Sequence, residues 1–269
     1  MKKYMRTGGM IVVMWMMAWG AIAQQSGEFP VPLSDPNKRA KLRAHLNTGS
    51  ITVKGTARKD ILVKYKAPDE KKTSEASKDG LRRIAGGTMD LEVSESNNYV
   101  KVGSDSWNHR IDLEIEVPSG IDLRVEAYND GDIFVSNIQG EVELKNYNGE
   151  ITADGISGTA VASTYNGDIK IAFANVTAGT PMSYNTYNGD IDLTFPADYK
   201  CSLKMKTERG EIYTDFDVKM IQGGPIEKKE VKSGTYKVSI DEWVRADING
   251  GGPELAMKNY NGDIKIRKK

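Results

Sequence analysis

The chain has 269 residues, with 37 basic and 37 acidic side chains and therefore no formal net charge at pH 7. This balance gives no electrostatic basis for binding nucleic acid, and the length allows one large β domain or two smaller ones. The single cysteine, Cys201, excludes an internal disulfide, so the fold must be stabilised by burial and hydrogen bonding.

The first 23 residues have the features of a secretory signal peptide. Lys2, Lys3 and Arg6 precede an apolar run, Met10–Ala23, whose last three residues read Ala-Ile-Ala, a small-x-small cleavage site. An uncleaved anchor is the alternative, but the run is shorter than the ~20 residues of a membrane-spanning helix. We therefore expect cleavage after Ala23, export to the periplasm or the cell surface, and no integral membrane span afterwards.

The next two segments differ in pattern. Residues 24–38 contain three prolines and little periodicity, which predicts an extended N-terminal arm. Residues 39–120 alternate apolar and polar side chains in short runs, which predicts an N-terminal β region. The charged stretch 67–87 reads as a loop within it. The expected strands are 49–55, 60–66, 88–96, 98–104 and 109–118.

Residues 121–269 repeat one phrase, of which "TYNGDIKI" at 164–171 is an example. The glycine of the phrase recurs at steps of 18 to 22 residues until Gly210, and an insertion at about 218–257 separates it from the last copy. A fixed period of this length is typical of repeat architectures. The glycines are Gly131, Gly149, Gly167, Gly189, Gly210 and Gly262.

Aligning the units on this glycine predicts which side chains are buried. Isoleucine stands two residues after the glycine in all six units, and apolar residues stand five and seven before it in most. Alternation of this kind indicates strands with one buried face; it also places Cys201 in the core as a small hydrophobic side chain. The isoleucines are Ile133, Ile151, Ile169, Ile191, Ile212 and Ile264.

Two all-β architectures fit this pattern. The first is a β-solenoid, similar to a β-helix, with coils of about 18–22 residues into which the N-terminal β region continues. The second is an antiparallel β meander or sandwich, because Asn-Gly is a strong hairpin signal. A column of identical residues favours the solenoid, since stacked coils repeat at the strand spacing of about 4.8 Å.

The chain must bend sharply at the Asn-Gly pair of each phrase, which we call the corner, and both residues tolerate a positive φ. Just before the corner, the alternation of side chains along the strand places one polar residue of each unit on the inward face. We expect this column of polar residues to hydrogen-bond from coil to coil. Its members are Asn146, Thr164, Thr186, Thr207 and Asn259.

By the same alternation, the tyrosines and acids of the phrase are expected to point outward, which makes them the candidate binding surface. The tyrosines either stack to stabilise the coils or form a platform for a glycan or peptide. The candidate residues are Tyr147, Tyr165, Tyr187, Tyr260, Asp168, Asp190 and Asp263.

The acids also form a column of like charges, which repel one another at the strand spacing. Backbone N–H groups of the corner, with help from Lys145, Lys170 and Lys265, would offset this repulsion. A bound cation such as calcium is the alternative, although the spacing differs from the glycine-rich calcium repeat. Its ligands would be Asp132, Glu150, Asp168 and Asp190.

Nothing in the sequence points to catalysis or to a cofactor. The only histidines, His45 and His109, lie in strand-like segments, and no nucleophile, metal-ligand or phosphate-loop motif is present. We therefore expect a non-enzymatic protein.

Three segments together carry a family resemblance: "LNTGSITVKG" at 46–55, "IDLEIEVPSGIDLRVEAYNDGDIFV" at 111–135 and "INGGGPELAMKNYNGDIKI" at 248–266. With the repeated phrases, residues 39–269 resemble the bacterial "putative adhesin" family, a domain of unknown function in envelope proteins. The first 38 residues are similar to those of Bacteroidota members. The resemblance implies a β-solenoid and an envelope location, and no catalytic residues.

Three functions follow as hypotheses. The first is a binding or adhesion module that presents the repeat surface to a glycan or protein of the envelope or cell surface. The second is a periplasmic structural or envelope-regulatory accessory protein, and the third is a solenoid polysaccharide lyase or hydrolase, which would need a compact acid–base cluster. Unpaired strand edges at the ends of a solenoid also lead us to expect a cap or a homodimer there.

Overall fold

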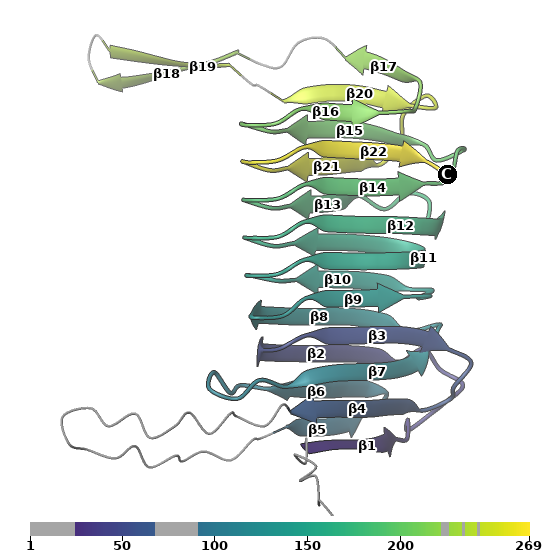
Figure 1. Ribbon diagram of the computed structural model, residues 1–269. Coiled ribbons are helices and arrows are strands. Elements are labelled where there is room, and N and C mark those ends of the chain that lie inside the picture. The colour runs from purple at the N-terminus through teal and green to yellow at the C-terminus, as the bar shows by residue number, and fades with distance from the viewer. Residues whose placement is uncertain (1–24, 68–90, 222–225, 233–234, 241–242) are drawn as a thin grey trace, which may run out of the picture.

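The computed structural model describes residues 25–67, 91–221, 226–232, 235–240 and 243–269, and every element in these ranges is a β-strand (Figure 1). The all-β prediction is therefore confirmed for the described part of the chain. The expected signal peptide, 1–23, and nearly all of the expected loop at 67–87 lie outside it.

The strands form two stacks that we name sheet A and sheet B, with β11 (Ile151–Ser163) running from one into the other. In spatial order, sheet A contains β1 (Gln25–Val31), β4 (Ile61–Ala67), β7 (Asp112–Pro118), β3 (Ile51–Thr56), β9 (Ile133–Ser136), the first half of β11, β12 (Ile169–Val176), β14 (Ile191–Phe195), β22 (Ile264–Lys268) and β16 (Ile212–Thr214).

Sheet B contains, in the same direction, β5 (Glu92–Ser96), β6 (Tyr99–Ser104), β2 (Lys41–Thr48), β8 (Asp122–Asn129), β10 (Glu141–Lys145), the second half of β11, β13 (Met182–Asn185), β21 (Glu254–Lys258), β15 (Cys201–Lys206), β20 (Val244–Ile248) and β17 (Val218–Ile221). A separate hairpin pairs β18 (Ile226–Lys232) with β19 (Thr235–Ile240).

Each repeat contributes one strand to sheet B, turns at the Asn-Gly corner and returns as one strand of sheet A. Neighbouring repeats pair in parallel and in register, with Ile133, Ile151 and Ile169 directly opposite one another. This pairing contradicts the antiparallel meander in the repeat region, because the chain makes corners between sheets where a meander would make hairpins. Antiparallel pairs occur at the two ends of the stack, in β1–β4–β7, β5–β6 and β15–β20–β17.

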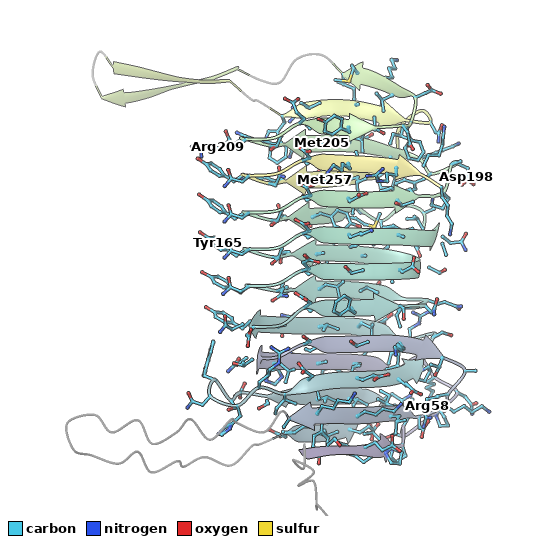
Figure 2. The ribbon with its side chains drawn as sticks, viewed as in Figure 1. Arg58, Tyr165, Asp198, Met205, Arg209 and Met257 are labelled. Atoms are coloured by element: carbon cyan, nitrogen blue, oxygen red, sulfur yellow. The ribbon has the colours of Figure 1, made fainter. Side chains whose placement is uncertain are left out.

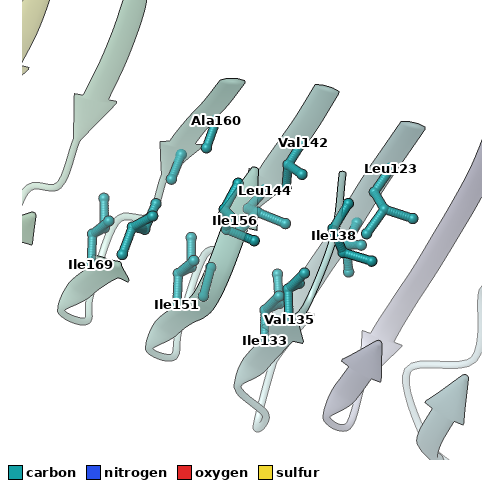
Figure 3. Close-up of a cluster of buried hydrophobic side chains, with 14 of the residues drawn as sticks. Leu123, Ile133, Val135, Ile138, Val142, Leu144, Ile151, Ile156, Ala160 and Ile169 are labelled. Carbon is teal, nitrogen blue, oxygen red and sulfur yellow. The ribbon is translucent and has the colours of Figure 1, made fainter. Parts of the chain in front are cut away.

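The inward faces of both sheets enclose one apolar core (Figure 3). The predicted isoleucine column is confirmed: five of its members have no exposed surface, and Ile212 is partly exposed because β16 is the last strand of sheet A. The columns five and seven residues before the glycine are also buried, as predicted. Cys201 lies in this core, where burial, with a smaller contribution from Asp247, raises the pKa of its thiol to about 12.

Two coils lie outside chain order in the stack. The coil of β2 and β3 lies between the coils of β6/β7 and β8/β9. The last coil, β21 and β22, lies between β13/β14 and β15/β16. The insertion at 218–257 supplies β17 and β20, which lengthen sheet B, and residues 25–31 of the predicted arm form β1, which pairs with β4.

The corner glycines are required by the close approach of one coil to the next. Gly167 has a φ of +150°, and a Cβ built on it would lie 2.1 Å from the carbonyl oxygen of Gly149 in the neighbouring coil. Real Cβ atoms do not come so close to an oxygen, so a side chain here would push the two coils apart. Gly120, by contrast, has no atom within 4 Å of the same position.

We predict that Gly167→Ala destabilises the protein by about 1–3 kcal/mol through this overlap. Gly120→Ala, the matched control, should be neutral or stabilising by up to about 1 kcal/mol, because it restricts only the unfolded chain. Urea denaturation of both variants measures the difference. Equal effects of the two substitutions would contradict the close-approach explanation.

Candidate functional site

The tyrosines of the phrase form one continuous aromatic ladder along the corner of the stack (Figure 2). Their ring centroids are 4.7 to 5.1 Å apart and their planes lie within 7° of parallel. We name this surface the tyrosine ridge. Its rings are those of Tyr128, Tyr147, Tyr165, Tyr187 and Tyr260.

Both ends of the ladder are covered by other side chains. The indole of Trp107 meets Tyr128 edge to face, with centroids 4.8 Å apart, and the guanidinium of Arg209 lies 5.4 Å from the Tyr260 ring centroid. Arg209 stands at the asparagine position of its phrase, where a cation can cover the last ring. Trp107, with 56% of its surface exposed, is the most exposed aromatic side chain of this group.

Sequence reasoning identified four of these rings and missed Tyr128, Trp107 and Arg209. Tyr128 belongs to a phrase with one extra residue, Asp130, which adopts a φ of +56°. An alignment that allowed this insertion would have found it. Trp107 comes from a loop that carries no repeat, so no signal in the sequence links it to the ladder.

Stacking decides which atoms of the ridge can meet a ligand. Each inner ring is covered on both faces by its neighbours, yet Tyr147, Tyr165 and Tyr187 keep 40–42% of their surface exposed. The exposed surface therefore consists of ring edges and hydroxyl groups. The inner tyrosines therefore do not offer a flat aromatic face to a ligand. They offer a row of evenly spaced phenol groups.

A second ladder lies beside the tyrosines and corrects one expectation. The side-chain amide of each corner asparagine donates to the amide oxygen of the preceding one, as Asn166 does to Asn148 at 2.8 Å and Asn188 to Asn166 at 2.7 Å. These asparagines form parallel bridges and do not adopt the positive φ that we expected for a turn residue. Asparagine is therefore used here for its amide.

The inner polar column hydrogen-bonds from coil to coil, as predicted. Thr164 Oγ1 donates to the Gly149 carbonyl at 3.0 Å, and Thr186 Oγ1 donates to the Gly167 carbonyl at 2.9 Å. Asn259 Nδ2 makes the same bond to Gly189 at 3.1 Å, but its Oδ1 is buried and has no partner. The column thus satisfies the carbonyls that the corner turns inward.

Backbone hydrogen bonds also stabilise the acid column. The N–H of Asp190 donates to Asp168 Oδ1, and the N–H of Asp263 donates to Asp190 Oδ1, both at 2.8 Å. Asp132 accepts in the same way from Glu150. Each of these carboxylates therefore links its coil to the next one, as we expected.

Of the three lysines expected to support the acids, Lys265 does so, with Nζ 2.6 Å from Asp190 Oδ2. Lys145 pairs with Glu143 instead, and Lys170 makes no ion pair with a described residue. Burial alone would raise the pKa of Asp190, but Lys265 and the Asp263 N–H outweigh it and hold that pKa below its ordinary value. Among the described residues, no group of three or more His, Cys, Asp or Glu side chains could hold a metal ion.

We predict that Asn259→Thr stabilises the protein by about 1 kcal/mol, because threonine keeps the donor and removes an unpaired buried acceptor. Asn146→Thr is the matched control, since the Oδ1 of Asn146 accepts from the Tyr147 N–H at 2.8 Å, and it should bring no gain. Thermal unfolding of both variants makes the comparison. A loss of stability in Asn259→Thr would show that the amide oxygen has a partner.

We predict that Asp190→Asn destabilises the protein at neutral pH but not in acid. The pKa of Asp190 is lower in the folded than in the unfolded state, so its charge stabilises the fold above the unfolded pKa, and this contribution is lost as the pH falls through the folded pKa. The difference from the parent protein should therefore shrink below about pH 4. Urea denaturation across this range tests it; a constant difference would contradict the ionic explanation.

Comparison with solved structures finds the same kind of fold in a "putative cell adhesion protein" from Clostridium sporogenes ATCC 15579. It has a TM-score of 0.50 at 12% identity and covers 92% of this chain and all of that one. A "putative adhesin" from Bacteroides fragilis NCTC 9343 has a TM-score of 0.39 at 12% identity, covering 93% and 98% of the two chains. A "putative adhesin" from Parabacteroides merdae ATCC 43184 has a TM-score of 0.27 at 9% identity, covering 91% and 96%.

Comparison with curated protein sequences finds no match. Within the described residues, no helix could cross a membrane. Residues 122–267, more than half of the chain, match a family described as Toastrack DUF4097, a domain of unknown function, and this match indicates no enzymatic family. Together with the stacked strands and repeated corners, this match shows that the chain belongs to the Toastrack DUF4097 family.

Proposed function

We propose that this protein is a non-enzymatic, exported binding module of the cell envelope, and that the tyrosine ridge contacts a glycan or protein partner. The observation that carries the proposal is the continuous row of half-exposed tyrosines on one corner of the stack. Tyrosine is enriched where proteins bind partners because it offers contact area and a hydroxyl group at a low entropic cost.

The geometry of the ridge supports recognition through hydroxyl groups. The ring faces are covered, so a ligand meets phenol groups at intervals of about 5 Å, beside the acid column. A rigid row of donors and acceptors suits an extended partner that can repeat the same hydrogen bond from coil to coil. The exposed indole of Trp107 adds an apolar contact at one end of the row.

A periplasmic structural or envelope-regulatory accessory protein is the alternative, and the engagement of tyrosines, asparagines and acids in coil-to-coil contacts favours it. Protease treatment of intact cells distinguishes the two locations, because a surface adhesin is cleaved there and a periplasmic protein is protected. A lyase has no support from the geometry, since the acids form a column whose oxygens accept backbone hydrogen bonds.

We predict that replacing Tyr147, Tyr165 and Tyr187 together by phenylalanine abolishes binding without loss of stability. Phenylalanine keeps the stacked rings and removes only the exposed hydroxyl groups. Replacement of the same three residues by serine should also lower stability, because each aromatic pair contributes about 0.5–1.5 kcal/mol. Binding of the labelled protein to a glycan array and to immobilised envelope proteins, with thermal unfolding in parallel, measures both effects.

Phe134→Ser is the matched control, since Phe134 is 41% exposed but lies on the outer face of sheet A and stacks on none of the rings of the ridge. It should leave binding unchanged. Binding that survives both triple substitutions would overturn the proposal and favour a purely structural ladder. Binding lost only in the serine variant would show that ring edges, and not hydroxyl groups, make the contact.

A further inference from the structure

The two ends of the stack differ in how they are finished. At the β1/β5 end, residues before β2 lie across the edge: Ser34 donates to Glu95 through both its N–H and its hydroxyl, and Asn98 exchanges hydrogen bonds with Asp35. The edge strand β1 also contains Pro30, which lacks an N–H to offer to another strand. This end is closed by polar contacts, as terminal repeats of soluble solenoids are.

In the described part of the chain, the opposite end is open and stepped. Sheet A ends at β16, whereas sheet B continues by two more strands, β20 and β17 (Figure 1). No other described strand pairs with the outer edge of β16 or of β17. The end also exposes apolar side chains, with 57% of Met220, 53% of Tyr213 and 43% of Ile221 accessible.

The exposed side chains include one that belongs on the inner face. Met220 lies opposite Ala246 in the β17–β20 pair, and Ala246 faces the core with 1% exposure. Met220 therefore has the inward orientation of a core residue but no described strand of sheet A in front of it. Val218, the other inward residue of β17, packs against the core, whereas Met220 lacks the partner that a continued sheet A would supply.

We propose that this end is a dimer interface, in which a second copy of this chain places its β17 against the outer edge of β16. The stepped end is self-complementary. Under a twofold axis parallel to the strands, the two extra strands of sheet B of each copy, β20 and β17, fill the space beyond β16 at the end of sheet A of the other copy. The interface is therefore isologous, with each contact made twice. Both sheets then run without a break from one copy into the next.

The strand directions agree with this arrangement. β15 and β17 both run antiparallel to β20 and so share one direction, while β16 returns from the corner in the opposite direction (Figure 1). A twofold axis along the strands preserves these directions, so β16 and the partner's β17 pair antiparallel, and the unpaired backbone groups of both edges find partners.

The same symmetry sets the register and gives charge complementarity. The pairings through β20 place Val218 beside Cys201 and Met220 beside Leu203 along the strands. From the number of residues on each side of the corner we infer that Thr214 stands at the level of Leu203. Thr214 then lies opposite the partner's Met220, and Tyr213 opposite the partner's Ile221. Asp215, whose Oδ1 accepts from the Lys268 N–H at 2.6 Å, lies opposite the partner's Lys219, and its other carboxylate oxygen completes an ion pair.

Lys219 supports this pairing because it is exposed and pairs with no residue of the described part of the chain. A standard interface buries about 800 Å² per partner, whereas the contacts argued here come from β16 and β17 of each copy alone. We therefore expect a reversible dimer, whose affinity depends strongly on the few contacts named here.

Sedimentation equilibrium of the purified protein over a range of concentrations tests the proposal. The parent protein should show a concentration-dependent dimer, and Lys219→Glu should weaken it about tenfold or more, because it places like charges opposite each other twice. Asp215→Lys should weaken it similarly. The double variant Asp215→Lys/Lys219→Glu exchanges the two charges and should recover most of the affinity.

Two further variants separate loss of dimer from loss of fold. Met220→Lys should abolish the dimer and leave the monomer folded, since this side chain is already exposed. Phe134→Lys, a charge placed on an exposed side chain far from the end, should leave the dimer unchanged. A parent protein that is monomeric at every concentration, or a double variant as weak as the single ones, would overturn the proposal.

Discussion

Every coil must turn where its neighbours turn, because at the Asn-Gly corner one backbone lies too close to the next to leave room for a side chain. A glycine carbonyl of one coil lies against the glycine of the following coil, so neither position has room for a side chain. This constraint keeps the register of the whole stack. Once the corners are aligned, the isoleucines, the threonine and asparagine column, the asparagine amides and the tyrosine rings all fall into line at the strand spacing.

Much of this arrangement could be predicted because each repeat contains, within a few residues, the alternation of apolar and polar side chains that decides which of them are buried. Ile151 and Ile169 are core residues by parity alone, and Thr164 points inward for the same reason. The conformation of Asn166 could not be predicted so well, since asparagine suits both a left-handed turn and an amide ladder. Contact with a neighbouring coil, which one segment of sequence does not reveal, decided between these roles.

The order of the coils is the part of the fold that the sequence conceals. The phrase around Gly262 matches those around Gly167 and Gly189, so it fits equally well beside any of them. Only the pairing of β21 and β22 places it between two coils that are earlier in the chain. Trp107 was missed for a related reason, since its place beside Tyr128 comes from a loop of another coil.

The out-of-order coils have a consequence for how the molecule assembles. A simple repeat protein grows from either end and frays from its termini. Here the segment 254–268, which follows β15 and β16 in the chain, is the layer that joins β14 to β16, so the β15/β16 coil cannot reach its final position before this segment is present. Assembly of the stack therefore depends on contacts between residues far apart in the sequence, which are slow to form. Slow closure and the protected position of 254–268 between two other coils therefore have the same topological origin.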